Sequence, residues 1–191
     1  MRNAETLDAL LALFVERGFA DLSVHDMAKL SKRSKSTLYG VASSKDGIIE
    51  AVVKEFFRRA TEQVERCAAD GAPGERLGSY LSAISSALAP VGPQFFADLD
   101  RLQATREIYH ANIRMASQRV QQLALAALPK RSPVDPRFVG ALAGVVIEAI
   151  HRGQFQSTAG LAAADAYSAL AALLSAGIRN PDLPVTESET Q

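Results

Sequence analysis

Residues 23–46 read SVHDMAKLSKRSKSTLYGVASSKD, which is the pattern of two short helices joined by a tight polar turn. Ser34 is a good N-cap for the second helix, because its hydroxyl can accept a hydrogen bond from a free backbone N–H of the first turn. From Lys29 to Lys45 there are five basic residues and no acidic one. This charge and spacing are typical of a helix-turn-helix unit whose second helix enters a DNA groove.

Amphipathic helices are predicted on both sides of this segment. Apolar residues at positions 7, 10, 11, 14 and 15 repeat with helical spacing. Gly18 ends that helix, since glycine adopts the left-handed backbone at little cost. On the other side, Ser43 with Asp46 marks the start of a long helix over residues 45–67. The first domain is therefore predicted to have three helices and to bind DNA.

Further helices are predicted along the rest of the chain. They cover residues 75–88, a stretch from 93 to about 128 with a break near Arg106, then 136–157 and 162–177. No stretch has the alternation of a strand. We predict an all-α fold of about nine helices, divided into a helix-turn-helix domain in residues 1–46, a larger helical domain in residues 47–180 and a disordered tail in residues 181–191.

Composition limits the classes of function. The 191 residues are 48% hydrophobic with a net charge of zero, so no global field draws the chain to nucleic acid or to an anionic membrane. No apolar run reaches the roughly 20 residues that span a bilayer, so no membrane partner is expected. Cys67 is the one cysteine and cannot form an internal disulfide. Without a signal-like N-terminus, this favours the cytoplasm.

Residues 136–157 are unusually apolar. Between Phe138 and Ile150 the only charge is Glu148, and the next predicted helix is alanine-rich. A helix that is apolar on every side is buried on every side. Gly140 and Gly144 would allow the close approach of another helix. Two interpretations remain open, a homodimer interface made by the last two helices and a sealed core within one chain.

The chain resembles the TetR family of transcriptional regulators. The resemblance is carried by Leu-Phe-x-x-x-Gly-Phe at 13–19, Ser-Val-x-Asp-Met-Ala at 23–28, Ser-x-x-Thr-Leu-Tyr at 34–39 and Ser-Lys-Asp at 44–46. It covers roughly the first 55 residues, and beyond them only the architecture is similar. Lys32 stands where the family commonly has a turn glycine, and Ala42 where it commonly has an aromatic residue, so the turn must form without glycine.

The resemblance implies which residues contact DNA. Side chains on the first turn of the second short helix would reach base edges, and Tyr39 and Lys45 would contact phosphates. The extra basic residues of the turn would add phosphate contacts, and Ser23 opens a helix whose free N–H groups suit a phosphate. The residues so implied are Ser23, Arg33, Ser34, Lys35, Ser36, Thr37, Tyr39 and Lys45.

The resemblance also implies a function and an effector site. The expected protein is a homodimeric repressor that binds a near-palindromic operator in double-stranded DNA and is released by a small-molecule effector. The helix over residues 45–67 joins both domains and would act as the lever. Residues expected to line the effector site are Phe95, Phe96, Leu99, Tyr109, Asn112, Ile113, His151 and Phe155. A filled core without a cavity is the alternative.

Two other classes of function are alternatives for this sequence. The pairs Glu107-x-x-His110 and Glu148-x-x-His151 have the spacing of ligands in a di-iron bundle, but the two further glutamates of such a site are missing. No catalytic residue, metal or cofactor is therefore expected. The departures at Lys32 and Ala42 leave open a helical binding module that has lost DNA binding. A gel shift distinguishes such a module from a DNA-binding regulator, and metal analysis of the purified protein distinguishes a metal-dependent enzyme from both.

Overall fold

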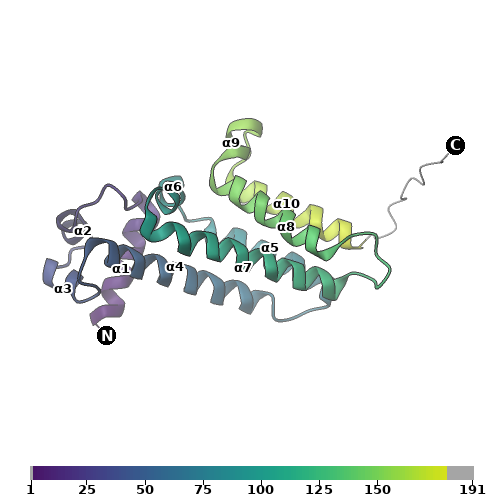
Figure 1. The fold of residues 1–191 in the computed structure, drawn as a ribbon, viewed down its shortest axis with the longest axis horizontal. Helices are drawn as coiled ribbons and strands as arrows, with labels where there is room; N and C mark the ends of the chain where they lie inside the picture. The colour runs from purple at the N-terminus through teal and green to yellow at the C-terminus, as the bar shows by residue number, and fades with distance from the viewer. Residues whose placement is uncertain (1, 180–191) are drawn as a thin grey trace.

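The structure is a computed structural model that describes residues 2–179, so the predicted tail at 181–191 lies outside the described residues. Within this range the chain forms ten helices and no strand, which confirms the all-α prediction. Figure 1 shows α1–α3 gathered at one end of an elongated bundle. The helices are α1 (Arg2–Arg17), α2 (Val24–Leu30), α3 (Lys35–Tyr39), α4 (Lys45–Cys67), α5 (Pro73–Leu88), α6 (Pro93–Arg101), α7 (Gln103–Ala127), α8 (Pro136–His151), α9 (Gln154–Ala159) and α10 (Ala163–Arg179).

Serine caps set the starts of the early helices. The Ser23 hydroxyl accepts from the Asp26 N–H at 3.1 Å, while the Asp26 carboxylate accepts from the Ser23 N–H at 3.0 Å, which completes a capping box. The Ser34 hydroxyl accepts from the Thr37 N–H at 3.1 Å. At α4 the prediction was one residue out, because the cap is Ser44 and not Ser43.

The turn between α2 and α3 forms without glycine, as predicted. Lys32 adopts a φ of 55°, and it is the one non-glycine residue with positive φ among those that the structure describes. The Arg33 N–H donates to the Ala28 carbonyl at 2.9 Å and closes the turn. A left-handed conformation at a residue with a Cβ costs about 1–2 kcal/mol, so the surrounding packing must hold it.

Two hydrophobic cores share α4 and α7. The N-terminal core contains side chains of α1, α2, α3, the first half of α4, α6 and the start of α7. The C-terminal core contains the end of α4, α5, the second half of α7, α8 and α10. On α4, Phe56 belongs to the first core and Val64 to the second. Helix α6 thus packs with the helix-turn-helix unit although it lies far from it in sequence.

Two predicted helix boundaries were wrong. The break between α6 and α7 falls at Leu102, which has the extended φ and ψ of −94° and 129°, and not near Arg106. The buried Thr105 hydroxyl donates to the Leu99 carbonyl at 2.9 Å and stabilises this break. The helix predicted over 136–157 stops at His151, because Gly153 takes a φ of 68° that a residue with a Cβ rarely adopts.

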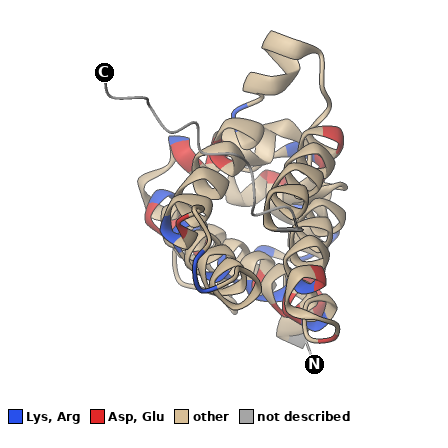
Figure 2. Cartoon of the chain, turned by 90° about the vertical axis from the view of Figure 1, so that its right-hand side faces the viewer, with Lys and Arg blue, Asp and Glu red and all other residues tan. Residues whose placement is uncertain are grey.

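Helix α9 is therefore a separate element. None of its residues is buried, and Gly160 ends it with a second positive φ of 68°. In the end-on view of Figure 2 the short α9 projects from the bundle and carries no charged residue.

Helix α8 is not buried on every side. Gly140 and Gly144 face α7 of the same chain, since a Cβ at Gly140 would lie 2.6 Å from the Ser117 carbonyl and one at Gly144 would collide with the Ser117 hydroxyl. The helix that these two glycines admit is therefore α7 of the same chain. The opposite face is open, and Phe138 and Val145 are 65% and 67% exposed. Within residues 2–179, no helix has the length and apolar character needed to cross a membrane.

Candidate DNA-binding surface and ligand cavity

The first turn of α3 presents a group of hydroxyls to solvent. The Ser34 hydroxyl lies 2.8 Å from that of Ser36 and 2.7 Å from that of Thr37. Beneath them Leu38 is fully buried and anchors the helix in the N-terminal core. Lys35 and Ser36 are exposed, and Tyr39 at the end of the helix is 50% exposed. The short helix thus holds polar and basic side chains outward on a fixed base.

The other predicted DNA contacts lie around α3. The Lys45 ammonium group donates to the Ala20 carbonyl at 3.0 Å, so it ties the start of α4 to the loop before α2. Arg33 turns toward α1, where its guanidinium lies 3.8 Å from the Glu5 carboxylate. The Ser23 hydroxyl is used in the capping box of α2. The structure therefore gathers Ser34 to Tyr39 on one element, and the remaining three contacts also have roles within the fold.

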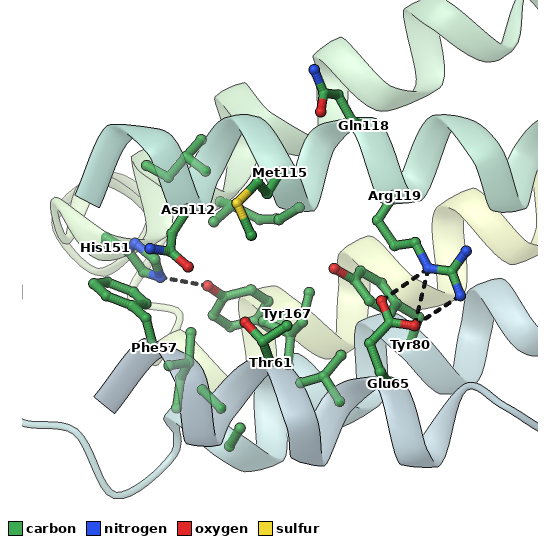
Figure 3. A pocket seen from close by; sticks show the side chains of 18 of the residues that line it. Phe57, Thr61, Glu65, Tyr80, Asn112, Met115, Gln118, Arg119, His151 and Tyr167 are labelled. Atoms are coloured by element: carbon green, nitrogen blue, oxygen red, sulfur yellow. Dashed lines mark hydrogen bonds and ion pairs between the residues drawn. The ribbon is translucent and has the colours of Figure 1, made fainter. Parts of the chain in front are cut away.

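A cavity of about 270 Å³ lies between α4, α5, α7, α8 and α10. Figure 3 shows its walls. Most of the lining is apolar, with contributions from Phe57, Val64, Ile84, Leu88, Ile113 and Ile147. The structure thus has an open space where the sequence left open either a cavity or a filled core.

The predicted effector residues divide between different places. Tyr109, Asn112, Ile113 and His151 line the cavity. Phe96 lines a neighbouring, more polar cavity, of which Tyr109 and His151 also form a wall. Phe95 and Leu99 are buried in the N-terminal core, and Phe155 packs against the C-terminal core. These last three residues line neither cavity.

Three aromatic side chains form a hydrogen-bonded group at one end of the cavity. The Tyr109 hydroxyl lies 3.0 Å from His151 Nδ1, and the Tyr167 hydroxyl lies 2.6 Å from His151 Nε2. Phe96 stacks on the His151 ring at a centroid distance of 4.0 Å. Burial lowers the pKa of His151 to about 3, so the imidazole is neutral at physiological pH. Burial also raises the pKa of both tyrosines.

An ion pair lies at the other end. Arg119 Nε is 2.9 Å and Nη2 is 2.8 Å from the two Glu65 carboxylate oxygens, a two-pronged arrangement that binds strongly. Burial, and after it the charge of Glu65, raises the pKa of Tyr80 to about 12. Neither these three residues nor Tyr167 were predicted from the sequence to line the cavity. Glu65 and Arg119 are 54 positions apart, and no local pattern links them.

Helix α6 connects the cavity with the helix-turn-helix unit. On one side the buried Asp98 carboxylate accepts from the backbone N–H groups of Phe19 at 2.6 Å and Ala20 at 2.9 Å. Arg101 pairs with Asp21 at 2.8 Å. On the other side Phe96 stacks on His151. One helix of nine residues therefore touches both the loop before α2 and the wall of the cavity.

The two Glu-x-x-His pairs do not converge. Among the residues that the structure describes, no three His, Cys, Asp or Glu side chains lie close enough to hold a metal ion. His110 lies 3.4 Å from Asp100, and both ring nitrogens of His151 are engaged by tyrosines.

Comparison with known proteins agrees with this architecture. Residues 7–52 match the sequence model of bacterial regulatory proteins of the tetR family. No curated protein matches the chain. Among solved structures, a TetR/AcrR-family regulator from Thermobifida fusca YX-ER1 is similar with a TM-score of 0.68 at 22% identity, over 92% of this chain and 97% of that one. A TetR-like regulator from Rhodococcus sp. RHA1 has a TM-score of 0.66 at 19% identity, over 93% and 96%.

A third similar structure contains ligands. AibR, solved with isovaleryl coenzyme A and operator DNA, has a TM-score of 0.63 at 19% identity and covers 91% of this chain and 97% of its own. At these sequence identities, the similarity to solved structures establishes only the fold of the chain. The match of residues 7–52 to the family model is a similarity of sequence. Residues 7–52 thus match the tetR family of bacterial regulatory proteins in sequence, and the described chain has the fold of TetR-family transcriptional regulators.

Proposed function

We propose that the protein is a homodimeric repressor that binds a near-palindromic operator through α3 and leaves it when a small molecule occupies the cavity. The observation that carries this proposal is the exposed first turn of α3, where hydroxyls and Lys35 stand on a buried anchor. Side chains in such a position reach base edges in the major groove, and nearby basic groups contact phosphates.

The dimer is proposed to form through α8 and α10. Both helices expose large apolar side chains, namely Phe138, Val145 and Leu173, which is 66% exposed. Phe138 and Val145 are seven positions apart and so share one face of α8. Exposed apolar surface marks an interaction site, and a second copy would cover this face by two-fold symmetry. Two copies of α3 would then contact half-sites about one helical turn, ~34–36 Å, apart.

Release is proposed to pass through α4 and α6. A ligand between α4 and α7 would displace α4, the helix that joins both domains. Helix α6 adds a second route, which runs from His151 through Phe96 to the loop that Asp98 holds. Coupling of this kind is typically ~1–3 kcal/mol, or a roughly 5–150-fold change in operator affinity. The complex of AibR with both a small molecule and operator DNA supports such a pairing of sites.

A gel shift with the DNA upstream of the protein's own gene tests the proposal. Specific binding should fall steeply as salt rises, because several phosphate contacts per subunit release counterions. Binding that is equally tight on random DNA, or that does not respond to salt, would contradict it. Lys54→Ala is a matched control, since Lys54 pairs with Glu50 on the exposed side of α4 and has no proposed DNA contact.

A further inference from the structure

The polar groups of the cavity are concentrated at its two ends. Figure 3 shows Asn112, His151 and Tyr167 together at one end and Glu65, Tyr80 and Arg119 at the other. Between them the lining is mostly apolar, and Thr61 is a polar exception that Figure 3 shows between the two ends. An occupant that satisfies both kinds of lining is mainly apolar and has its polar group at one end.

The Tyr109–His151–Tyr167 group has one hydroxyl proton more than its own hydrogen bonds use. A neutral imidazole donates from one nitrogen and accepts at the other. The group therefore holds three protons, one on each tyrosine and one on the imidazole, but makes two hydrogen bonds. Within the described part of the chain neither tyrosine hydroxyl has another hydrogen-bond partner, so one O–H is available to a ligand.

The distances assign this free proton to Tyr109. O–H donors make shorter hydrogen bonds than N–H donors. The 2.6 Å contact fits the Tyr167 hydroxyl donating to Nε2, and the 3.0 Å contact fits Nδ1–H donating to the Tyr109 oxygen. Tyr109 then accepts from the imidazole and keeps its own proton for another acceptor. Its pKa is raised by burial, so the hydroxyl remains protonated.

Asn112 supplies the complementary acceptor. Its Nδ2 donates to the Ile108 carbonyl at 2.9 Å, which leaves Oδ1 without a hydrogen-bond donor among the described residues. Tyr109 and Asn112 are three positions apart on α7 and so share a face of the helix. Both line the cavity. One donor and one acceptor side by side match a hydroxyl group, which accepts from the first and donates to the second.

A charged head group has no counter-charge to meet. At the Tyr109 end the lining groups are neutral, and an ion buried there without a partner would carry a large desolvation penalty. At the far end Arg119 is already neutralised by Glu65 through both carboxylate oxygens. An anion would have to displace Glu65 and leave that carboxylate unpaired.

We propose that the cavity takes an uncharged, mainly apolar molecule with a terminal hydroxyl group, to which Tyr109 donates and from which Asn112 accepts. The statement that this molecule is the effector rests on the proposed function. The statement that the cavity binds this class of molecule can be tested without DNA.

Binding of matched probes to the full chain is measured by calorimetry. Decanol, decanoate and decylamine share one apolar body and differ in the charge of the head, and decyl methyl ether keeps the acceptor oxygen of decanol without its proton. Decanol should bind most tightly, with the ether roughly 3- to 10-fold weaker for the loss of one hydrogen bond. Tyr109→Phe should weaken decanol binding by a similar factor. Tyr39→Phe, on the exposed end of α3 and outside the lining of the cavity, should leave decanol binding unchanged.

The outcomes separate the ligand class from the regulatory role. Tighter or equal binding of decanoate, decylamine or isovaleryl coenzyme A, or no binding of any probe, would overturn the proposed ligand class whatever the gel shift shows. Decanol that binds in the predicted order supports the ligand class, even if the protein then fails to bind or leave DNA and the proposed function is wrong. If Tyr109→Phe does not fold, the ratio of decanol to ether in the wild type still decides.

Discussion

Replacing Asp98 by alanine should destabilise the protein far more than its position on a short helix suggests. The side chain is 1% exposed, and its Oδ2 accepts from the N–H groups of Phe19 and Ala20 while its Oδ1 accepts from Gln94 Nε2 at 2.8 Å. Alanine leaves two buried backbone donors without an acceptor, each costing about 1–3 kcal/mol, so we expect a loss of about 3 kcal/mol or more. Asp98→Asn keeps one acceptor oxygen and should cost about 1 kcal/mol.

Urea denaturation at a fixed protein concentration measures these changes. Asp100→Ala is the matched control two positions along α6, because that carboxylate is partly exposed and makes ion pairs at 3.4–3.6 Å, which should cost less than about 1 kcal/mol. Since Asp98 holds the loop before α2, Asp98→Asn should also reduce the effect of a bound ligand on operator affinity. If Asp98→Ala is within about 0.5 kcal/mol of the wild type, the proposed link through α6 is wrong.

Three further predictions concern the DNA surface, the dimer and the pH dependence of stability. Thr37→Ala should relax the preference for particular bases, while Lys45→Ala should weaken binding to every sequence alike. Competition between operator variants measures both effects, and the proposed roles are wrong if both variants lose affinity without any change in base preference. Val145→Glu should give folded monomers in sedimentation, because Val145 is exposed. Val146→Glu should instead lower the melting temperature, because Val146 is half-buried. A dimer that persists with Val145→Glu would refute the proposed interface. The pKa of His151 is lowered to about 3 in the folded state, so its contribution to stability is complete above the unfolded pKa of about 6.5 and is lost as pH falls. From pH 8 to pH 5 the wild type should lose about 2 kcal/mol more than His151→Gln, and equal losses would show that the imidazole is not buried in a neutral form.

Local sequence patterns were sufficient for the helix-turn-helix unit. Caps, turn and helix lengths depend on neighbours a few residues away, so Ser23 and Ser34 could be assigned from spacing, and the turn at Lys32 was expected to form without glycine. The errors arose where two local rules competed. Apolar periodicity continued through Gly153, and only the folded chain shows that this residue takes the left-handed conformation that ends α8.

The composition of the cavity could not be obtained in this way. Half of the predicted effector residues line it, because Tyr109, Asn112 and Ile113 share one face of α7 and His151 follows on α8. Phe95 and Leu99 are also apolar, but they pack against side chains of α1 and α4 in the N-terminal core. They do so because the helix break at Leu102 turns α6 toward that core. Apolar periodicity indicates that a face is buried, and it does not indicate which of two cores receives that face.

Partnerships over long sequence separations were decided by the packing of the helices. Tyr167 reaches His151 from α10, Arg119 reaches Glu65 from α7, and Asp98 reaches the loop before α2 across 78 and 79 positions. Helix starts, turns and buried faces can be predicted from the sequence, because each depends on residues that are close together along the chain. The partner of a buried polar group depends on how whole helices cross, and that is settled only when both cores assemble around α4 and α7.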